Sequence, residues 1–236
     1  MSAEPAPAPA PRRKGARRIV EIPRAVLRAL NEGREETITL VEWLAIDDAK
    51  LLASVLPDAG FTAAQTRIAI EHADEVTGLG IQERVKRIGA QLHVALRADR
   101  RRERLFERLA THGSDRVRSL VAYSVTADEE LPLAKRLAVA KRFAADRAMS
   151  VRECAWDSFR PWLARDLERA RRLLDPVRSD PSDYVRRSVG NWLNDASKSR
   201  PEWVRSLAAE WRRASKTAET AWIVRHALRT LRKGGG

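Results

Sequence analysis

Apolar residues recur at helical spacing along most of the chain, and one short pattern repeats in its second half. A Val followed by a basic residue begins at positions 117, 151, 185 and 224, so successive copies lie 34, 34 and 39 residues apart. A related pair, Val85 and Lys86, lies 32 residues before the first copy. Apolar residues follow each Val at intervals of three and four, which places them on one face of an α-helix. The pattern predicts a row of helices that share one apolar face.

A second set of helices is predicted between the members of this row. Ranges 131–145, 166–174 and 201–213 each carry an apolar stripe, and no strand-like alternation of useful length is visible. Two helices per repeat are typical of an α-solenoid, whose neighbouring repeats bury each other's faces. The signature residues of tetratricopeptide repeats are missing, and an interval of 39 breaks their period. We predict an all-α, HEAT-like repeat α-solenoid with a concave basic groove, forming one domain over 19–233.

Residues with short polar side chains precede three of the repeat helices. A side-chain oxygen at this position accepts a hydrogen bond from a free backbone N–H of the first turn. The predicted N-caps are Ser114 or Asp115, Ser150, and Ser182 or Asp183.

The two ends of the chain differ from the predicted domain. Residues 1–18 combine Pro–Ala alternation with basic residues and are predicted to be a disordered basic arm, and 234–236 form a Gly tail. No segment has the apolar length of a membrane span or of a secretory signal. Cys154 is the one cysteine, so no intramolecular disulfide can form. We expect a protein of the reducing bacterial cytoplasm, located at the nucleoid.

Positive charge is spread beyond the arm. The chain has a formal net charge of +13, and the first 18 residues hold five basic side chains and one Glu, which leaves +9 for the remainder. A basic folded domain favours phosphate-bearing partners, most simply nucleic acid. A generally basic, soluble surface is the alternative.

The basic residue that follows each Val would form a ladder in a stacked array, with one rung per repeat. The rungs are Lys86, Arg118, Arg152, Arg186 and Arg225. Such a ladder could neutralise DNA phosphates without reading base sequence. Alternatively, these cations could pair within the stack with the carboxylates available near them, which are Asp115, Asp146, Asp180 and Asp183.

One repeat helix carries two carboxylates, Glu153 and Asp157, at i,i+4 spacing on one face. The matching positions of the next repeat are Arg187 and Asn191, and Trp156 and Trp192 lie on the same two helices. This arrangement could form an acidic, aromatic site within a basic groove. An Arg187–Glu153 bridge between repeats, beside tryptophans of the core, is the alternative.

Four segments resemble the DNA alkylation repair family of AlkC and AlkD over about residues 84–233. They are SVRECAWDSFRPW at 150–162, VRRSVGNWLNDASK at 185–198, PEWV at 201–204 and WIVRHALRTL at 222–231. The resemblance implies a solenoid that cradles duplex DNA. In active members it also implies hydrolysis of the N-glycosidic bond of N3- or N7-alkylated purines, in which a carboxylate near the sugar stabilises oxocarbenium-like charge.

The resemblance also implies roles for individual residues. Glu153 matches the Glu of the Val-Arg-Glu-Trp-Ala-Trp pattern of AlkC-like proteins and is the catalytic candidate, with Asp157 second. Cys154 departs from that pattern by replacing its first Trp, and Asn191 stands where AlkD-like proteins tend to have Trp. The residues expected to contact DNA are Arg118, Arg152, Trp156, Arg186, Arg187, Asn191, Trp192, Arg225, His226 and Arg229.

Three functions remain open at this point. The chain could be a monomeric glycosylase acting on damaged double-stranded DNA, a relative that binds distorted or branched DNA without catalysis, or a protein-interaction scaffold. The basic domain disfavours the scaffold. The four His residues show no metal-ligand spacing, and no P-loop or hydrolase triad is visible, so we expect no metal and no cofactor.

Overall fold

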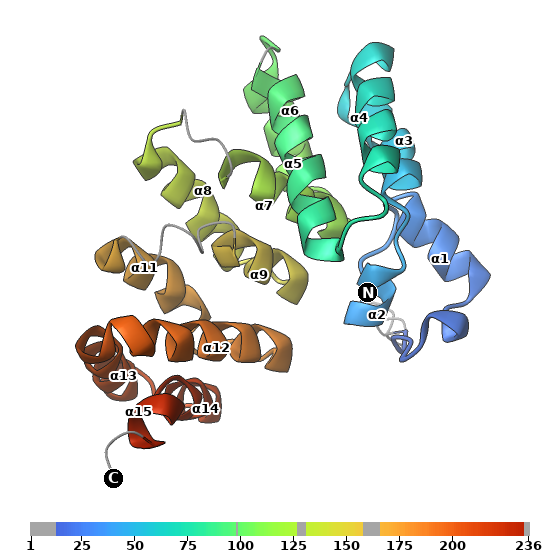
Figure 1. Cartoon of the computed structure of the whole chain (residues 1–236). Helices are drawn as coiled ribbons and strands as arrows, with labels where there is room; N and C mark the ends of the chain where they lie inside the picture. Colours follow the sequence, from blue (N-terminus) through green and yellow to red (C-terminus); the bar gives the residue numbers. More distant parts are fainter. Residues whose placement is uncertain (1–12, 98, 127–130, 158–165, 234–236) are drawn as a thin grey trace, which may run out of the picture.

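The computed structural model describes residues 13–97, 99–126, 131–157 and 166–233, and all regular structure in this part is helical (Figure 1). The longest helices have 17 residues, and none in the described ranges is long and apolar enough to cross a membrane. The elements are η1 (Ile19–Glu21), α1 (Arg24–Asn31), α2 (Leu40–Leu44), α3 (Asp48–Ala59), α4 (Ala63–Glu75), α5 (Ile81–Arg97), α6 (Arg102–Ala110), α7 (Asp115–Thr126), α8 (Leu133–Ala144), α9 (Met149–Asp157), α11 (Leu167–Leu174), η2 (Asp175–Val177), α12 (Asp183–Ser199), α13 (Pro201–Ala214), α14 (Ala218–Ala227) and α15 (Arg229–Lys233).

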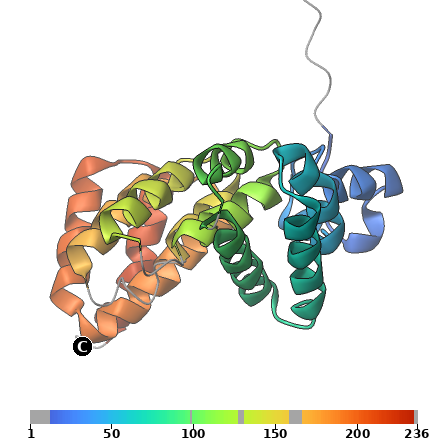
Figure 2. The same ribbon diagram turned by 90° about the horizontal axis from the view of Figure 1, so that it is seen from above.

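The helices pack in chain order as a curved, two-layered array. Helices α5, α7, α9, α12 and α14 contact one another in succession and form one layer. Helices α6, α8, α11 and α13 form the other layer, which lies on the outer side of the curve in Figure 1. In both views the N-terminal and C-terminal helices lie at opposite ends of the array (Figure 2). The all-α solenoid predicted from the periodicity is confirmed.

The repeated Val is the centre of this packing. The five Val residues at 85, 117, 151, 185 and 224 are at most 3% exposed, and all belong to one continuous hydrophobic core. Burial of such side chains is the main stabilising contribution in an α-solenoid, because each repeat covers the apolar face of the next. The helices predicted between them correspond to α8, α11 and α13.

The cap predictions were right for one repeat and wrong for two. The Ser182 hydroxyl oxygen accepts from the backbone N–H of Val185 at 3.5 Å and caps α12. The buried hydroxyl of Ser114 has no hydrogen-bond partner in the described residues. Ser150 lies inside α9, and its hydroxyl donates to the Asp115 carboxylate at 2.8 Å. The loop before α9 is instead closed by Asp146, whose Oδ1 accepts from Ala148 N at 2.8 Å.

Part of the segment that was predicted to be a disordered arm contacts the domain. Residues 1–12 and the Gly tail 234–236 lie outside the described residues, but 13–18 are placed against the domain. Arg13 Nη1 lies 2.5 Å from Glu42 Oε1, and Ala16 N donates to the same oxygen at 3.0 Å. Glu42 is completely buried, so its carboxylate needs these donors. Residues 13–18 of the predicted arm therefore belong to the structure that packs around Glu42.

Candidate nucleic-acid interface

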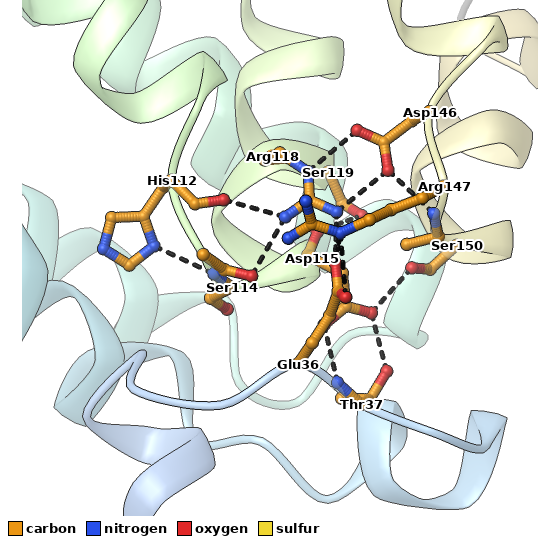
Figure 3. Close-up of polar contacts among 12 residues, drawn as sticks. Glu36, Thr37, His112, Ser114, Asp115, Arg118, Ser119, Asp146, Arg147 and Ser150 are labelled. Atoms are coloured by element: carbon orange, nitrogen blue, oxygen red, sulfur yellow. Dashed lines mark hydrogen bonds and ion pairs between the residues drawn. The ribbon is translucent and has the colours of Figure 1, made fainter. Parts of the chain in front are cut away.

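The guanidinium group of Arg118 is buried and binds neighbouring loops inside the array, so it is not free to bind a ligand (Figure 3). We call this set of contacts a brace. It is 3% exposed, and its Nη1 donates to the carbonyls of His112 and Gly113 at 2.8 and 3.0 Å. Its Nε and Nη2 donate to the two carboxylate oxygens of Asp146 at 2.8 and 2.9 Å, and Nη2 also pairs with Glu36. Burial disfavours the charge, but these two carboxylates raise the pKa of Arg118 above its ordinary value.

The same geometry recurs one repeat later. Arg152 Nη1 donates to the carbonyls of residues 146 and 147 at 2.9 and 2.8 Å, and its Nε and Nη2 engage the carboxylate of Asp180. Arg186 Nη1 likewise donates to the carbonyls of residues 180 and 181, at 3.3 and 2.6 Å, and its Nη2 lies 3.5 Å from Asp183. Each Arg thus binds the carbonyls five and six positions before it, and the first two bind an Asp 28 positions later.

The predicted ladder therefore divides into internal and exposed members. Arg118, Arg152 and Arg186 pair within the stack, because their guanidinium groups donate hydrogen bonds to the carbonyls of the interhelix loops. Their assignment as DNA contacts is corrected on this ground. Arg225 is exposed and makes no ion pair in the described residues, and the amine of Lys86, 38% exposed, lies 3.1 Å from Asp157.

Asp115 was also predicted to pair with the ladder, but its carboxylate accepts hydrogen bonds from the N-terminal segment instead (Figure 3). Its carboxylate accepts from the Thr37 backbone N–H and hydroxyl at 3.0 and 2.6 Å, as well as from the hydroxyl of Ser150. Asp115 is 1% exposed. It joins the loop before α2 to α7 and α9.

The two candidate catalytic carboxylates are enclosed. Asp157, at the end of α9, is 1% exposed, and its Oδ2 accepts from the Tyr123 hydroxyl of α7 at 3.0 Å and lies 3.1 Å from Lys86 Nζ of α5. This engagement makes Asp157 a link between three helices, so we withdraw it as a group that approaches a deoxyribose directly.

Glu153 lies one turn earlier on α9 and is 5% exposed. Burial raises the pKa of Tyr184 to about 12 and raises that of Tyr123 well above its ordinary value, and the Glu153 charge contributes to both increases. Burial and then Glu153 also raise the pKa of the Cys154 thiol to about 12, so this cysteine is not a nucleophile at neutral pH. Helices α7, α9 and α12 thus bring a carboxylate and two phenols together, which the sequence pattern alone did not predict.

The two tryptophans predicted to contact sugar or base are core residues. Trp156 is completely buried and Trp192 is 8% exposed. Their rings meet edge to face with centroids 6.4 Å apart, and Trp203 continues the contact at 6.3 Å from Trp192. The alternative of core tryptophans is therefore correct for this pair, and their assignment as DNA contacts is corrected. Arg187 was proposed to pair with Glu153 of the preceding repeat. In the structure its Nε lies 2.8 Å from Oδ2 of Asp183, on its own helix.

A partly exposed group of polar and aromatic side chains lies where α14 packs on α12. The ring of His226 stacks on Trp222 with centroids 4.8 Å apart and an interplanar angle of 8°. His226 Nε2 lies 2.7 Å from Asn191 Oδ1. The packing of the two helices depends on Gly190, because a Cβ there would lie 3.1 Å from His226 and 3.3 Å from Trp222. Sequence reasoning singled out Asn191 and His226 but not Trp222, although its i,i+4 spacing from His226 was a signal.

Cations surround this group. We call the C-terminal basic cluster the set Arg225, His226, Arg229 and Arg232, which with Trp222 lines a surface cavity of about 350 Å³. The three arginines are exposed and make no ion pair in the described part of the chain. Burial and the charges of Arg229, Arg187 and Arg225 lower the pKa of His226. A field that disfavours the protonated imidazole favours a bound anion, and Arg225 and Arg229 are exposed members of the predicted DNA contacts.

Metal ligation has no support in the described ranges, where no group of three or more His, Cys, Asp or Glu side chains could hold an ion. His72, His112 and His226 have contacts of other kinds, with Glu75, Ser114 and Asn191 respectively.

Two individual proteins resemble the chain in part. The chain is 40% identical over 80 residues to the uncharacterized protein YhaZ of Bacillus subtilis (strain 168), a match that covers 34% of the chain and 22% of YhaZ. The structure of Pseudomonas fluorescens alkylpurine DNA glycosylase AlkC, bound to DNA containing an abasic site analog, is similar with a TM-score of 0.48 at 26% identity. That match covers 80% of this chain and 63% of AlkC, so the chain spans less than two thirds of either protein.

A family model covers the repeats that contain the buried arginines, the enclosed carboxylates and, except for Arg232, the C-terminal basic cluster. The model is described as DNA alkylation repair enzyme, and it matches residues 115–231, from the first residue of α7 into α15. The resemblance expected from the sequence segments is confirmed. Through these repeats the chain belongs to the DNA alkylation repair enzyme family.

Proposed function

We propose that the chain binds double-stranded DNA as a monomer in alkylation repair, with the C-terminal basic cluster contacting the phosphate backbone. The observation that carries the proposal is the set of exposed, unpaired arginines beside the Trp222–His226 stack, of which Arg225 and Arg229 lie within the range of the family match. Guanidinium groups donate several N–H bonds to phosphate oxygens and release counterions on contact. On this proposal the duplex follows the inner layer from α5 to α14, where the sequence predicted a basic groove.

The enzymatic part of the proposal assigns glycosidic hydrolysis of alkylated purines to Glu153. An N3- or N7-alkylated base is already a good leaving group, so the protein needs chiefly to stabilise positive charge on the deoxyribose. A carboxylate does this, and the low dielectric around a residue that is 5% exposed strengthens the effect. Because Glu153 is enclosed, catalysis requires the end of α9 to open when the duplex binds.

The test is base release from methylated duplex DNA. We expect the wild-type chain to release 3- or 7-methylpurine, and Glu153→Gln to lose at least about a hundredfold in rate while DNA affinity is retained. The matched control is Glu168→Gln on an exposed part of α11, which removes the same charge and should retain the wild-type rate. Absence of release from the wild-type chain, with folding verified by circular dichroism, would contradict the enzymatic assignment and leave the binding proposal standing.

A second candidate function is binding of distorted or branched DNA without catalysis. It is favoured by the burial of both carboxylates, each at least 95% buried. On this alternative, three-way or bulged DNA binds more tightly than an unbroken duplex of equal length, and neither Glu153→Gln nor Asp157→Asn changes the preference. Equal affinity for both DNA forms would exclude it.

A further inference from the structure

A separate basic surface lies between the outer helices α8 and α11. A cavity of about 510 Å³ opens there, lined by Lys141, Arg172, Asp175, Pro176, Arg178 and Ser179. Lys141 lies near the end of α8, Arg172 near the end of α11, and Arg178 in the loop between η2 and α12. Three cations from three segments thus surround one hollow, on different helices from the C-terminal basic cluster.

These three cations have no carboxylate partner among the residues that the structure describes. Their sequence neighbours do have partners. Arg142 donates to both carboxylate oxygens of Glu107 on α6 at 2.7 and 2.9 Å, and Arg171 pairs with Glu210 on α13. The outer layer therefore supplies a carboxylate for Arg142, next to Lys141, and for Arg171, next to Arg172. It supplies none for the cations that line the cavity.

Arg178 is held in place with part of its guanidinium unsatisfied. Its Nη1 donates to the Asp175 carbonyl at 3.1 Å, which fixes the group at the cavity, and its Nε is buried without an acceptor in the described residues. A buried donor without an acceptor is unfavourable, so an added acceptor would stabilise the site. Asp175 also lines the cavity, and its Oδ1 accepts a hydrogen bond from the indole N–H of Trp211 at 2.8 Å.

We infer that this cavity binds a phosphate group, with Lys141 and Arg172 supplying charge and the Arg178 guanidinium supplying a fixed donor. A phosphate carries enough negative charge and enough acceptor oxygens to engage several cations at once, and charge-assisted hydrogen bonds of this kind are strong. The phosphate belongs either to a free phosphorylated compound or to a nucleic-acid backbone. Binding of free phosphate does not depend on the function proposed above, whereas the backbone source does.

The first experiment measures inorganic phosphate directly. The Arg Nε–Hε signals of the ¹⁵N-labelled full chain are followed during phosphate addition at constant ionic strength, with acetate as the comparison anion. We expect the Arg178 signal to shift with phosphate and not with acetate, and Arg172→Gln to weaken the affinity about tenfold. Arg171→Gln removes the same charge one position away, from a paired residue, and should change the affinity less than twofold.

The second experiment separates the two sources. The salt dependence of duplex binding is compared for the wild-type chain, Arg172→Gln and Arg171→Gln. A decrease of about one unit in the slope for Arg172→Gln alone identifies a backbone phosphate, since the slope counts phosphate contacts. Phosphate-induced shifts with equal slopes in all three proteins identify a free phosphorylated ligand. Equal slopes together with identical responses to phosphate and acetate would overturn the inference, and thermal unfolding of each variant verifies that it is folded.

Discussion

His112 is a half-buried histidine whose ring acts as a hydrogen-bond acceptor. Its Nδ1 accepts from the backbone N–H of Ser114 at 3.1 Å, in the loop that Arg118 holds (Figure 3). Burial and then the positive charge of Arg118 lower the pKa of His112. Protonation would put a second cation beside Arg118 and remove the acceptor from Ser114. The neutral ring is therefore part of the brace.

This histidine predicts an acid-dependent loss of stability. The pKa of His112 is lower in the folded than in the unfolded chain, so its contribution is complete above the unfolded value of about 6.5 and is lost as the pH falls through the folded value. His112→Asn keeps an acceptor but cannot titrate. We expect urea unfolding between pH 7.5 and 5 to show a smaller decline for the variant, with a slope difference of at most about 1.4 kcal/mol per pH unit. Equal declines would contradict the argument.

Two kinds of residue show what the sequence does not predict: the partners of the repeated arginines and the burial of Trp156. The alternative of stack pairing with Asp146 and Asp180 was visible in the sequence, but DNA phosphates would satisfy the same guanidinium groups equally well. Only the position of each Arg relative to the preceding loop, whose carbonyls it binds, decides between the two. Trp156 shows a second limit, because neighbouring helices and the outer layer together cover more of a helix than one apolar stripe suggests. Exposure along α9 could not be deduced from periodicity alone.

At the level of elements, the array depends on how closely successive helices of one layer approach. Helices α5 and α7 meet at Gly89, where an added Cβ would lie 2.6 Å from the Leu120 carbonyl oxygen and 2.9 Å from Tyr123 Cβ. The first of these is a backbone atom, which cannot rotate away. Helical periodicity predicted both elements, but a Gly inside a helix does not reveal by itself which backbone it admits.

Gly89→Ala tests this approach. Ala favours a helix over Gly by about 1 kcal/mol, but the overlap with α7 forces the two helices apart at a cost of about 1–3 kcal/mol. We expect a net decrease in the free energy of unfolding, measured by urea denaturation. Gly78→Ala is the control, since no atom lies within 4 Å of an added Cβ there, and its effect should stay within about 0.5 kcal/mol. A Gly89→Ala protein as stable as the wild type would mean that α5 and α7 can separate without loss.

At the level of the whole molecule, the arginines fall into groups with different partners. The arginines that follow Val117, Val151 and Val185 bind the loops between repeats. Those at the C-terminal end of the array are exposed to solvent. Net charge alone does not distinguish these groups, and the +9 of the predicted domain overstates the charge available to a ligand. Stability and DNA affinity should therefore respond to different substitutions, even where each removes one Arg.

Salt-dependent DNA binding separates the two groups. Each phosphate contact contributes about 0.9 to the slope of log affinity against log salt. If the C-terminal basic cluster grips the backbone, the double variant Arg225→Gln/Arg229→Gln should lose about two units of slope on an undamaged duplex and keep its thermal stability. Arg186→Gln removes a guanidinium whose Nη1 donates to the carbonyls of residues 180 and 181, so we expect lower stability and an unchanged slope. A slope lowered by Arg186→Gln and unaffected by the double variant would place the DNA on the loops instead of on α14 and α15.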